Sequence, residues 1–236
     1  MGKRSVALKL IGVNRMATLV RIAQIETLQG QTTVLHDIDW QQFEAILEDL
    51  GDKRASRIAY FDGVLEIQMP LPEHEADKEL IGDLIKMMFA YLLMDYECYG
   101  STTFKKHFKG QSMPAGIEPD NCFYVQNHRL MIGKTRLDLA VDPPPDLAIE
   151  VDLTSRTARS AYVALGVPEI WQYADRQLRI FRLQDGDYVE SLDSAIFPQC
   201  RVTTAINRCL EICRTKGRGA ALREFQAWMG QNVPKF

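Results

Sequence analysis

The sequence predicts an α/β or α+β domain in which a mixed β-sheet is flanked by α-helices. Three observations point to this class. Segments with helical and strand-like patterns follow one another as helix, hairpin, helix, strands, helix, strands and helix. Two Asp-Gly pairs separate apolar runs, which is typical of tight hairpin turns. Hydrophobic residues make up 46% of the 236 residues, enough to bury a core. Elements in this order are expected to pack as one sheet covered by helices.

The composition excludes several classes of protein. The net charge is −3, so binding to nucleic acid would need a local basic patch and not a global field. No apolar run approaches the roughly 18 residues that span a membrane, and the N-terminus does not resemble a signal peptide. The five cysteines are odd in number and lack the Cys-x-x-Cys spacing of zinc sites. We therefore expect free thiols in a cytoplasmic protein that has no membrane partner.

We expect residues 1–33 to form an N-terminal extension and residues 34–236 to form one domain that ends in C-terminal helices. Met16 offers an alternative start, which would leave residues 1–15 outside the protein. A strand or helix is expected around residues 20–25. Apolar residues at helical spacing predict a helix that begins after the N-cap Asp39 and stops at Gly51.

The remaining elements follow from the same rules. A hairpin is expected over 58–69, and a long helix opens at 73–75, where acidic residues suit the positive end of the helix dipole. Further elements are expected as strands at 98–104, 121–125, 146–153 and 167–173, some helical character at 129–139, a helix at 154–165 that ends at Gly166, a hairpin over 178–191, and helices at 203–214 and 220–229.

The strand at 146–153 carries acids on one face. Successive strand residues point to opposite faces, so Asp146, Glu150 and Asp152 share a face with Ala148. Like charges this close repel unless a positive group lies among them. A glutamate inside an apolar strand is costly to bury and needs a partner. A bound metal ion is the natural candidate for that partner.

A second acid points to the same site. Asp120 follows Pro119 at the head of the strand at 121–125, as Asp146 follows Pro145. If the two strands are neighbours, Asp120 and Glu150 converge and form a divalent-metal site of the magnesium type, which uses carboxylates, a backbone carbonyl and waters. Such a metal commonly serves phosphodiester hydrolysis. Asp146 lies about 13 Å from Glu150 along the strand, so we expect it to be a turn residue.

The order of these motifs resembles the putative restriction endonuclease family (Uma-two type) of the PD-(D/E)xK nuclease superfamily. The segments that carry the resemblance best are Pro145–Asp152 and Ala164–Trp171. The resemblance implies a restriction-endonuclease-like core that hydrolyses nucleic acid with Mg²⁺, for which Mn²⁺ can substitute.

Residue by residue, the resemblance implies that Asp120 and Glu150 bind the metal together with the backbone carbonyl of Val151. Glu75, at the start of the long helix, corresponds to a further acid of related nucleases, and His74 beside it is a weaker candidate. The catalytic residues expected are thus these three acids and Asp152. Three roles are open for Asp152: a second metal ligand, a residue that supports the ligands, or a solvated strand end.

The chain departs from the superfamily pattern at one position. Asp152 stands where that pattern has lysine, and no lysine occurs between Lys134 and Lys216. Arginine stabilises negative charge but its pKa is too high for it to act as a base. The positive charge is therefore expected from Arg156 or Arg159 in the following helix, or from Lys105 or Lys106 in the basic run at 105–109, which could equally be a solvated loop.

These observations predict a magnesium-dependent endonuclease that acts on DNA, with a homodimer expected by analogy alone. The alternative is a catalytically impaired protein of the same fold that binds nucleic acid or a protein partner. A third class, a metal-independent structural or regulatory protein, would leave the acids as turn and surface residues.

Overall fold

The computed structural model describes residues 7–8, 20–21, 25–51, 54–107, 113–153 and 155–234. Most of the expected N-terminal extension, and Phe108 and Lys109 of the basic run, lie outside these residues. The described helices are α1 (Trp40–Leu50), α2 (Pro72–Tyr91), α3 (His128–Met131), α4 (Arg156–Leu165), α5 (Val202–Lys216) and α6 (Arg218–Asn232). None of them is long and apolar enough to cross a membrane.

The described strands form two large sheets, where the sequence predicted one. The first has the order β13-β12-β11-β10-β9-β6, with β10 and β11 parallel and the other neighbours antiparallel. Its strands are β6 (Glu97–Cys98), β9 (Asn121–Tyr124), β10 (Leu147–Val151), β11 (Glu169–Ala174), β12 (Gln177–Gln184) and β13 (Asp187–Ser191).

The second large sheet is antiparallel and has the order β3-β5-β4-β8-β7. Its strands are β3 (Thr32–Leu35), β4 (Arg57–Phe61), β5 (Val64–Gln68), β7 (Phe104–Lys106) and β8 (Ala115–Ile117). Outside both sheets, β1 (Ala7–Leu8) pairs with β2 (Val20–Arg21). The strand expected at 98–104 is thus wrong as a single element, because its two ends belong to different sheets and Gly100, with a φ of 56°, lies between them.

The chain crosses from one sheet to the other between β8 and β9. β8 pairs with β4, whereas β9, only four residues later, pairs with β10. Pro119 lies in this crossing, and proline cannot donate the hydrogen bond that would continue a ladder. The crossing therefore places Asp120 at the seam between the two sheets.

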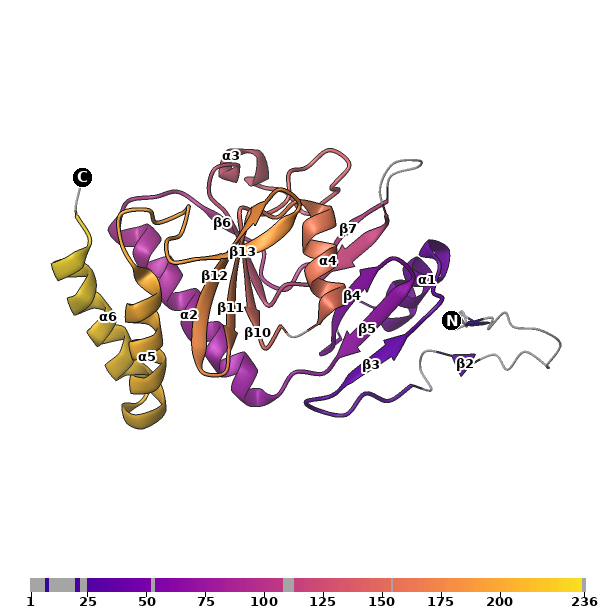
Figure 1. Cartoon of the computed structure of the whole chain (residues 1–236), viewed down its shortest axis with the longest axis horizontal. Coiled ribbons are helices and arrows are strands. Elements are labelled where there is room, and N and C mark those ends of the chain that lie inside the picture. The colour runs from indigo at the N-terminus through magenta and orange to yellow at the C-terminus, as the bar shows by residue number, and fades with distance from the viewer. Residues whose placement is uncertain are drawn as a thin grey trace.

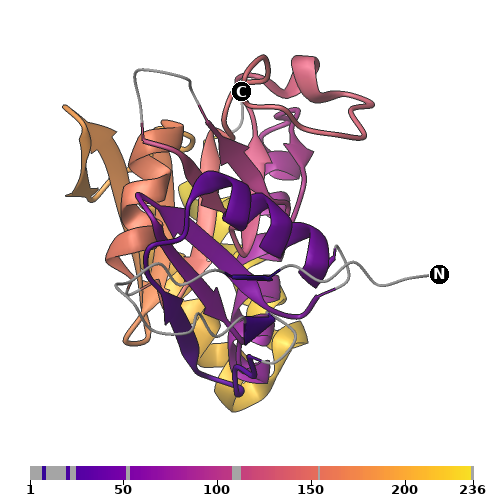
Figure 2. The same cartoon turned by 90° about the vertical axis from the view of Figure 1, so that its right-hand side faces the viewer.

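The layers of the molecule can be followed in Figures 1 and 2. Helices α2 and α5 cover one face of the six-stranded sheet, α6 packs against these two helices, and their shared core includes Leu147, Ile149 and Val151 of β10. Helix α4 covers the opposite face, where Ala148 is buried, and also contacts β4 and β8 of the second sheet. Helix α1 packs on the outer face of that second sheet. The alternation of faces predicted for β10 is confirmed.

Local sequence signals account for the element ends. Asp39 accepts a hydrogen bond from the backbone of Gln42, and the Gln42 side chain accepts one in return, which forms a capping box at α1. Both Asp-Gly turns have positive φ at both residues, the conformation of a type I′ hairpin turn. The predicted hairpins and the cap are confirmed.

The C-terminal helices lie against α2 as a lid over the sheet (Figure 1). The Arg214 guanidinium in α5 donates to Asp77 of α2 at 2.9 Å and to the hydroxyl of Tyr173 in β11 at 2.6 Å. Arg218 donates to Asp83 of α2 at 2.5 Å. Two of the basic residues in these helices therefore hold the lid in place through acids of α2.

The end of α4 yields a prediction about stability. Gly166 has a φ of 77°, in the left-handed region, and caps the helix through its backbone N–H. Because this conformation strains an L residue, Gly166→Ala is expected to lower the free energy of unfolding by about 1 kcal/mol. Gly230 lies inside α6, where an added methyl group meets no atom, so Gly230→Ala should raise it by up to about 1 kcal/mol. Chemical denaturation measures the free energy of unfolding of both variants. If both substitutions changed it in the same direction, the left-handed cap at Gly166 would be contradicted as the cause.

A buried carboxylate cluster as the candidate active site

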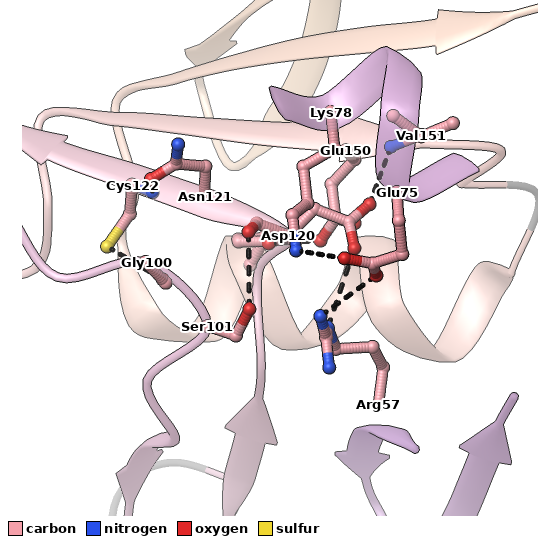
Figure 3. A network of polar contacts seen from close by, with 11 residues as sticks. Arg57, Glu75, Lys78, Gly100, Ser101, Asp120, Asn121, Cys122, Glu150 and Val151 are labelled. Atoms are coloured by element: carbon pink, nitrogen blue, oxygen red, sulfur yellow. Dashed lines mark hydrogen bonds and ion pairs between the residues drawn. The ribbon is translucent and has the colours of Figure 1, made fainter. Parts of the chain in front are cut away.

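Two carboxylates meet at the seam between the sheets. Asn121 is paired with Ile149 in the ladder between β9 and β10, so Asp120 lies beside Glu150 and Val151. Oδ2 of Asp120 accepts a hydrogen bond of 2.8 Å from the backbone N–H of Val151. The predicted convergence of Asp120 and Glu150 is therefore present in the structure (Figure 3).

Burial raises the pKa of both acids. Asp120 is 8% exposed and Glu150 is 7% exposed. Loss of contact with water raises the pKa of each carboxyl group. The charge of Asp120 raises the pKa of Glu150 further, and the charge of Glu75 raises that of Asp120. The hydroxyl of Tyr162 in α4 donates a hydrogen bond to Glu150 and opposes this rise. The pKa of Glu150 nevertheless lies well above its ordinary value.

Two cations adjoin the carboxylates. Arg57 of β4 places Nε 3.6 Å from Oδ1 of Asp120 and donates from Nη2 to Oε1 of Glu75 at 3.1 Å. Lys78 of α2 is a buried residue, and its Nζ lies 2.6 Å from Oε2 of Glu75. The charges of Arg57 and Lys78 both lower the pKa of Asp120. Figure 3 shows these side chains gathered around the two acids.

Sequence reasoning missed both of these cations. A signal for Lys78 existed, since it lies three residues after Glu75 and such pairs share a helix face. Arg57 gave no local signal, because only the packing of the second sheet brings β4 next to Asp120. Glu75, which was expected in the site, links the two cations and lies there as a half-exposed residue.

Asp152 is held by a histidine. Nε2 of His74 in α2 lies 2.6 Å from Oδ2 of Asp152, which has a φ of 57° just beyond the end of β10. Of the roles considered for Asp152, this contact supports one in which it positions a neighbouring side chain. His74 thus adjoins the site through Asp152, and within the described part of the chain it forms no hydrogen bond or ion pair with Asp120 or Glu150.

None of the four cations proposed from sequence is among the residues that line the pocket of the acids. Lys105 pairs with Glu44 of α1 at 2.9 Å, because β7 lies at the edge of the second sheet. Lys106 is the last residue of the same edge strand. Arg159 donates to the backbone carbonyl of Tyr188 and lies over the ring of Phe181. The cations that lie near Asp120 are instead Lys78 and Arg57.

The fourth of these cations, Arg156, is exposed on the first turn of α4. It lines a neighbouring pocket with Arg159 and Phe181 and not the pocket of the acids. The physical reason is the turn of the helix: Ala158 lines the pocket of the acids, and Arg156, two residues earlier, lies about 200° around the helix axis and faces the neighbouring pocket.

Asp146 has a structural role. Its Oδ2 accepts hydrogen bonds from the backbone N–H groups of Val125, Gln126 and Asn127, at 2.7, 2.9 and 3.3 Å. Its Oδ1 accepts a further bond from the side chain of Asn127. The carboxylate therefore caps the turn after β9, in agreement with the predicted turn role.

The acids open into a pocket between the two sheets. Its lining includes Arg57, Glu118, Asp120, Glu150 and Asp152. Among the described residues no group of three His, Cys, Asp or Glu side chains is arranged to hold a metal ion. A bound cation would therefore rely on the two carboxylates together with backbone oxygen and water, which is how Mg²⁺ is commonly held. Two adjacent acids with raised pKa values fit such a cation, because its charge would favour their ionised forms.

An α+β domain with buried, cation-flanked acids at the end of a sheet defines a protein of nuclease-like fold. A family model described as "Putative restriction endonuclease" (Uma2) matches residues 40–198 of the chain. The chain belongs to this family, as its motifs predicted, and has the restriction-endonuclease-like fold. No curated protein matches the sequence.

Proposed function

We propose that this protein is a metal-dependent endonuclease that hydrolyses phosphodiester bonds in DNA. The observation that carries the proposal is the buried pair of Asp120 and Glu150, with Lys78 and Arg57 beside it. Two neighbouring buried acids with raised pKa values cost free energy to ionise, so they do not stabilise a fold and are better explained by a function. Family membership supports the same reaction class.

The residues of the cluster divide into three roles. Asp120 and Glu150 would hold Mg²⁺ or Mn²⁺, and the carbonyl of Val151 is a further proposed ligand. When bound, the metal supplies the Lewis acidity that polarises a phosphoryl oxygen and lowers the pKa of an attacking water. Lys78 and Arg57 would face the negative charge that develops on the phosphate. Glu75 holds both cations in place through its two oxygens.

A second candidate is a protein of the same fold that has lost catalysis and retains binding. It is favoured by the pairing of Asp152 with His74, because the position of the superfamily lysine then carries an acid that is engaged with a neighbouring side chain. Lys78 argues against this candidate, since it supplies a lysine to the same cluster from a different element. A homodimer in the cytoplasm remains our expectation, as related nucleases address two strands with two sites.

Cleavage of plasmid and oligonucleotide DNA tests the proposal. Wild-type protein is expected to cleave with Mg²⁺ or Mn²⁺ and to lose this activity in EDTA. Asp120→Asn should lower cleavage about 10²- to 10³-fold, since the metal contributes several kcal/mol of charge stabilisation. Asp49→Asn, in an exposed acid of α1, is the matched control and should be neutral.

Calorimetry with Mg²⁺ separates the candidates. Binding that Asp120→Asn removes, without cleavage of any DNA substrate, would select the binding protein. A wild-type protein that binds neither Mg²⁺ nor Mn²⁺ would overturn the metal-dependent reading altogether.

A further inference from the structure

A second pocket adjoins that of the acids on the same side of the six-stranded sheet. Leu153 and Ser155 line both pockets, so the two share a wall. The second pocket is bounded by the first turn of α4 on one side and by β11 and β12 on the other, and its remaining lining residues are Arg156, Arg159, Ile170, Gln172, Phe181 and Tyr188.

Strand register extends this surface outward from Glu150. Glu150 is paired with Gln172 in β11, and Gln172 is paired with Arg179 in β12. Paired residues of neighbouring strands point to the same face, and strands lie about 4.8 Å apart. Arg179 therefore lies about 10 Å from Glu150 on the α4 face of the sheet. The side chain of Gln172 between them is fixed by a hydrogen bond of 2.7 Å to the carbonyl of Leu153.

Two arginines on this surface are available to a ligand. Arg156 is exposed and has no hydrogen bond or ion pair to any residue in the described part of the chain. Arg179 makes one long contact of 3.5 Å, with the exposed side chain of Gln177. Arg159 differs, because it is engaged with Tyr188, Phe181 and Asp187 and so forms the wall between α4 and the strands.

We propose that Arg156 and Arg179 bind the phosphate backbone of the DNA strand on the side of the scissile phosphate that lies over β11 and β12. The inference rests on the proposed function, since it takes Glu150 to mark the scissile position. Guanidinium groups bind phosphate oxygens in a bidentate manner, and the partly exposed Phe181, two residues from Arg179 on the same face of β12, offers apolar surface to a sugar. Because the net charge of the chain is −3, binding to DNA needs a local basic patch, and this surface would supply it.

Fluorescence anisotropy with a labelled DNA duplex in EDTA tests this site on the full chain, because binding is then measured without cleavage. Arg156→Ala and Arg179→Ala are each expected to weaken binding about fivefold. Each should also lower the slope of log Kd against log salt by about 0.9, the contribution of one phosphate contact. Arg182→Ala is the matched control, because Arg182 is exposed on the same strand but on the opposite face, and it should change Kd less than twofold.

The outcomes separate this inference from the proposed function. If wild-type protein cleaves DNA while Kd and the salt slope of both variants equal those of wild type, the arginine site is wrong and the nuclease stands. An equal loss in Arg182→Ala would also overturn it, as it would show a diffuse charge effect. A wild-type protein that neither binds nor cleaves DNA would overturn both.

Discussion

Glu150→Gln is expected to abolish metal-dependent cleavage and, at neutral pH, to make the metal-free protein more stable. Glutamine removes the charge that would bind Mg²⁺, so cleavage should fall about 10²- to 10³-fold or more. It also removes the cost of ionising a buried acid beside Asp120. A substitution that damaged only the fold would lower activity and stability together, so the opposite signs identify a functional acid.

The pH dependence of stability follows from the same acid. The pKa of Glu150 is raised well above its ordinary value of 4.5, first by burial and then by the charge of Asp120. The folded protein therefore holds a proton that the unfolded chain has released, and this stabilisation is lost as pH rises from about 4.5 through the raised pKa. Thermal unfolding without metal should show this decline in wild type and a flatter profile in Glu150→Gln. Added Mg²⁺ should restore stability to wild type alone.

Tyr162→Phe is the matched control for Glu150→Gln. It keeps the carboxylate and removes the hydroxyl that donates to it. Because that hydrogen bond lowers the pKa of Glu150, its loss should shift the rising limb of the activity profile to higher pH and leave cleavage at high pH largely intact. If Glu150→Gln retained Mg²⁺-dependent cleavage, the assignment of this residue as a metal ligand would be wrong.

Lys78→Met is expected to lower cleavage about 10²- to 10³-fold without weakening Mg²⁺ binding. The magnitude is that of removing one preorganised donor from a developing negative charge. Metal affinity should stay constant or rise, because a positive charge near Asp120 is lost. Single-turnover cleavage and calorimetry measure the two effects separately. A residue that merely supported the fold would lower both.

Three further variants sharpen the test of Lys78. Lys86→Met removes a lysine from the same helix, two turns further along, and should leave cleavage unchanged. Lys78→Arg should restore part of the activity, since the charge returns with a different shape. Asp152→Lys places a lysine at the superfamily position and should rescue Lys78→Met, with no gain in an otherwise wild-type chain. Full activity in Lys78→Met would exclude α2 as the source of the cation.

Local sequence patterns predicted many of the helix ends and turns of this protein. The cap at Asp39 and both Asp-Gly hairpins are interactions between residues a few positions apart, and such interactions form wherever the chain goes. The candidate site acids could be predicted for a related reason. A glutamate between Ile149 and Val151 conflicts with its apolar strand, and that conflict marks a site regardless of the fold around it.

The partners of those acids were decided by tertiary structure alone. The sequence, with its family resemblance, predicted a site at Asp120, Glu150 and Glu75, and it showed that position 152 lacks the lysine of the superfamily pattern. It could not say where the replacement lies, because Lys78 reaches the cluster only when α2 packs behind β10 and Arg57 only when β4 closes from the second sheet. Charge pairing acts through space over a few ångströms, whereas sequence patterns record only neighbours along the chain. The split into two sheets, which no local pattern recorded, is what brings the cations to the acids.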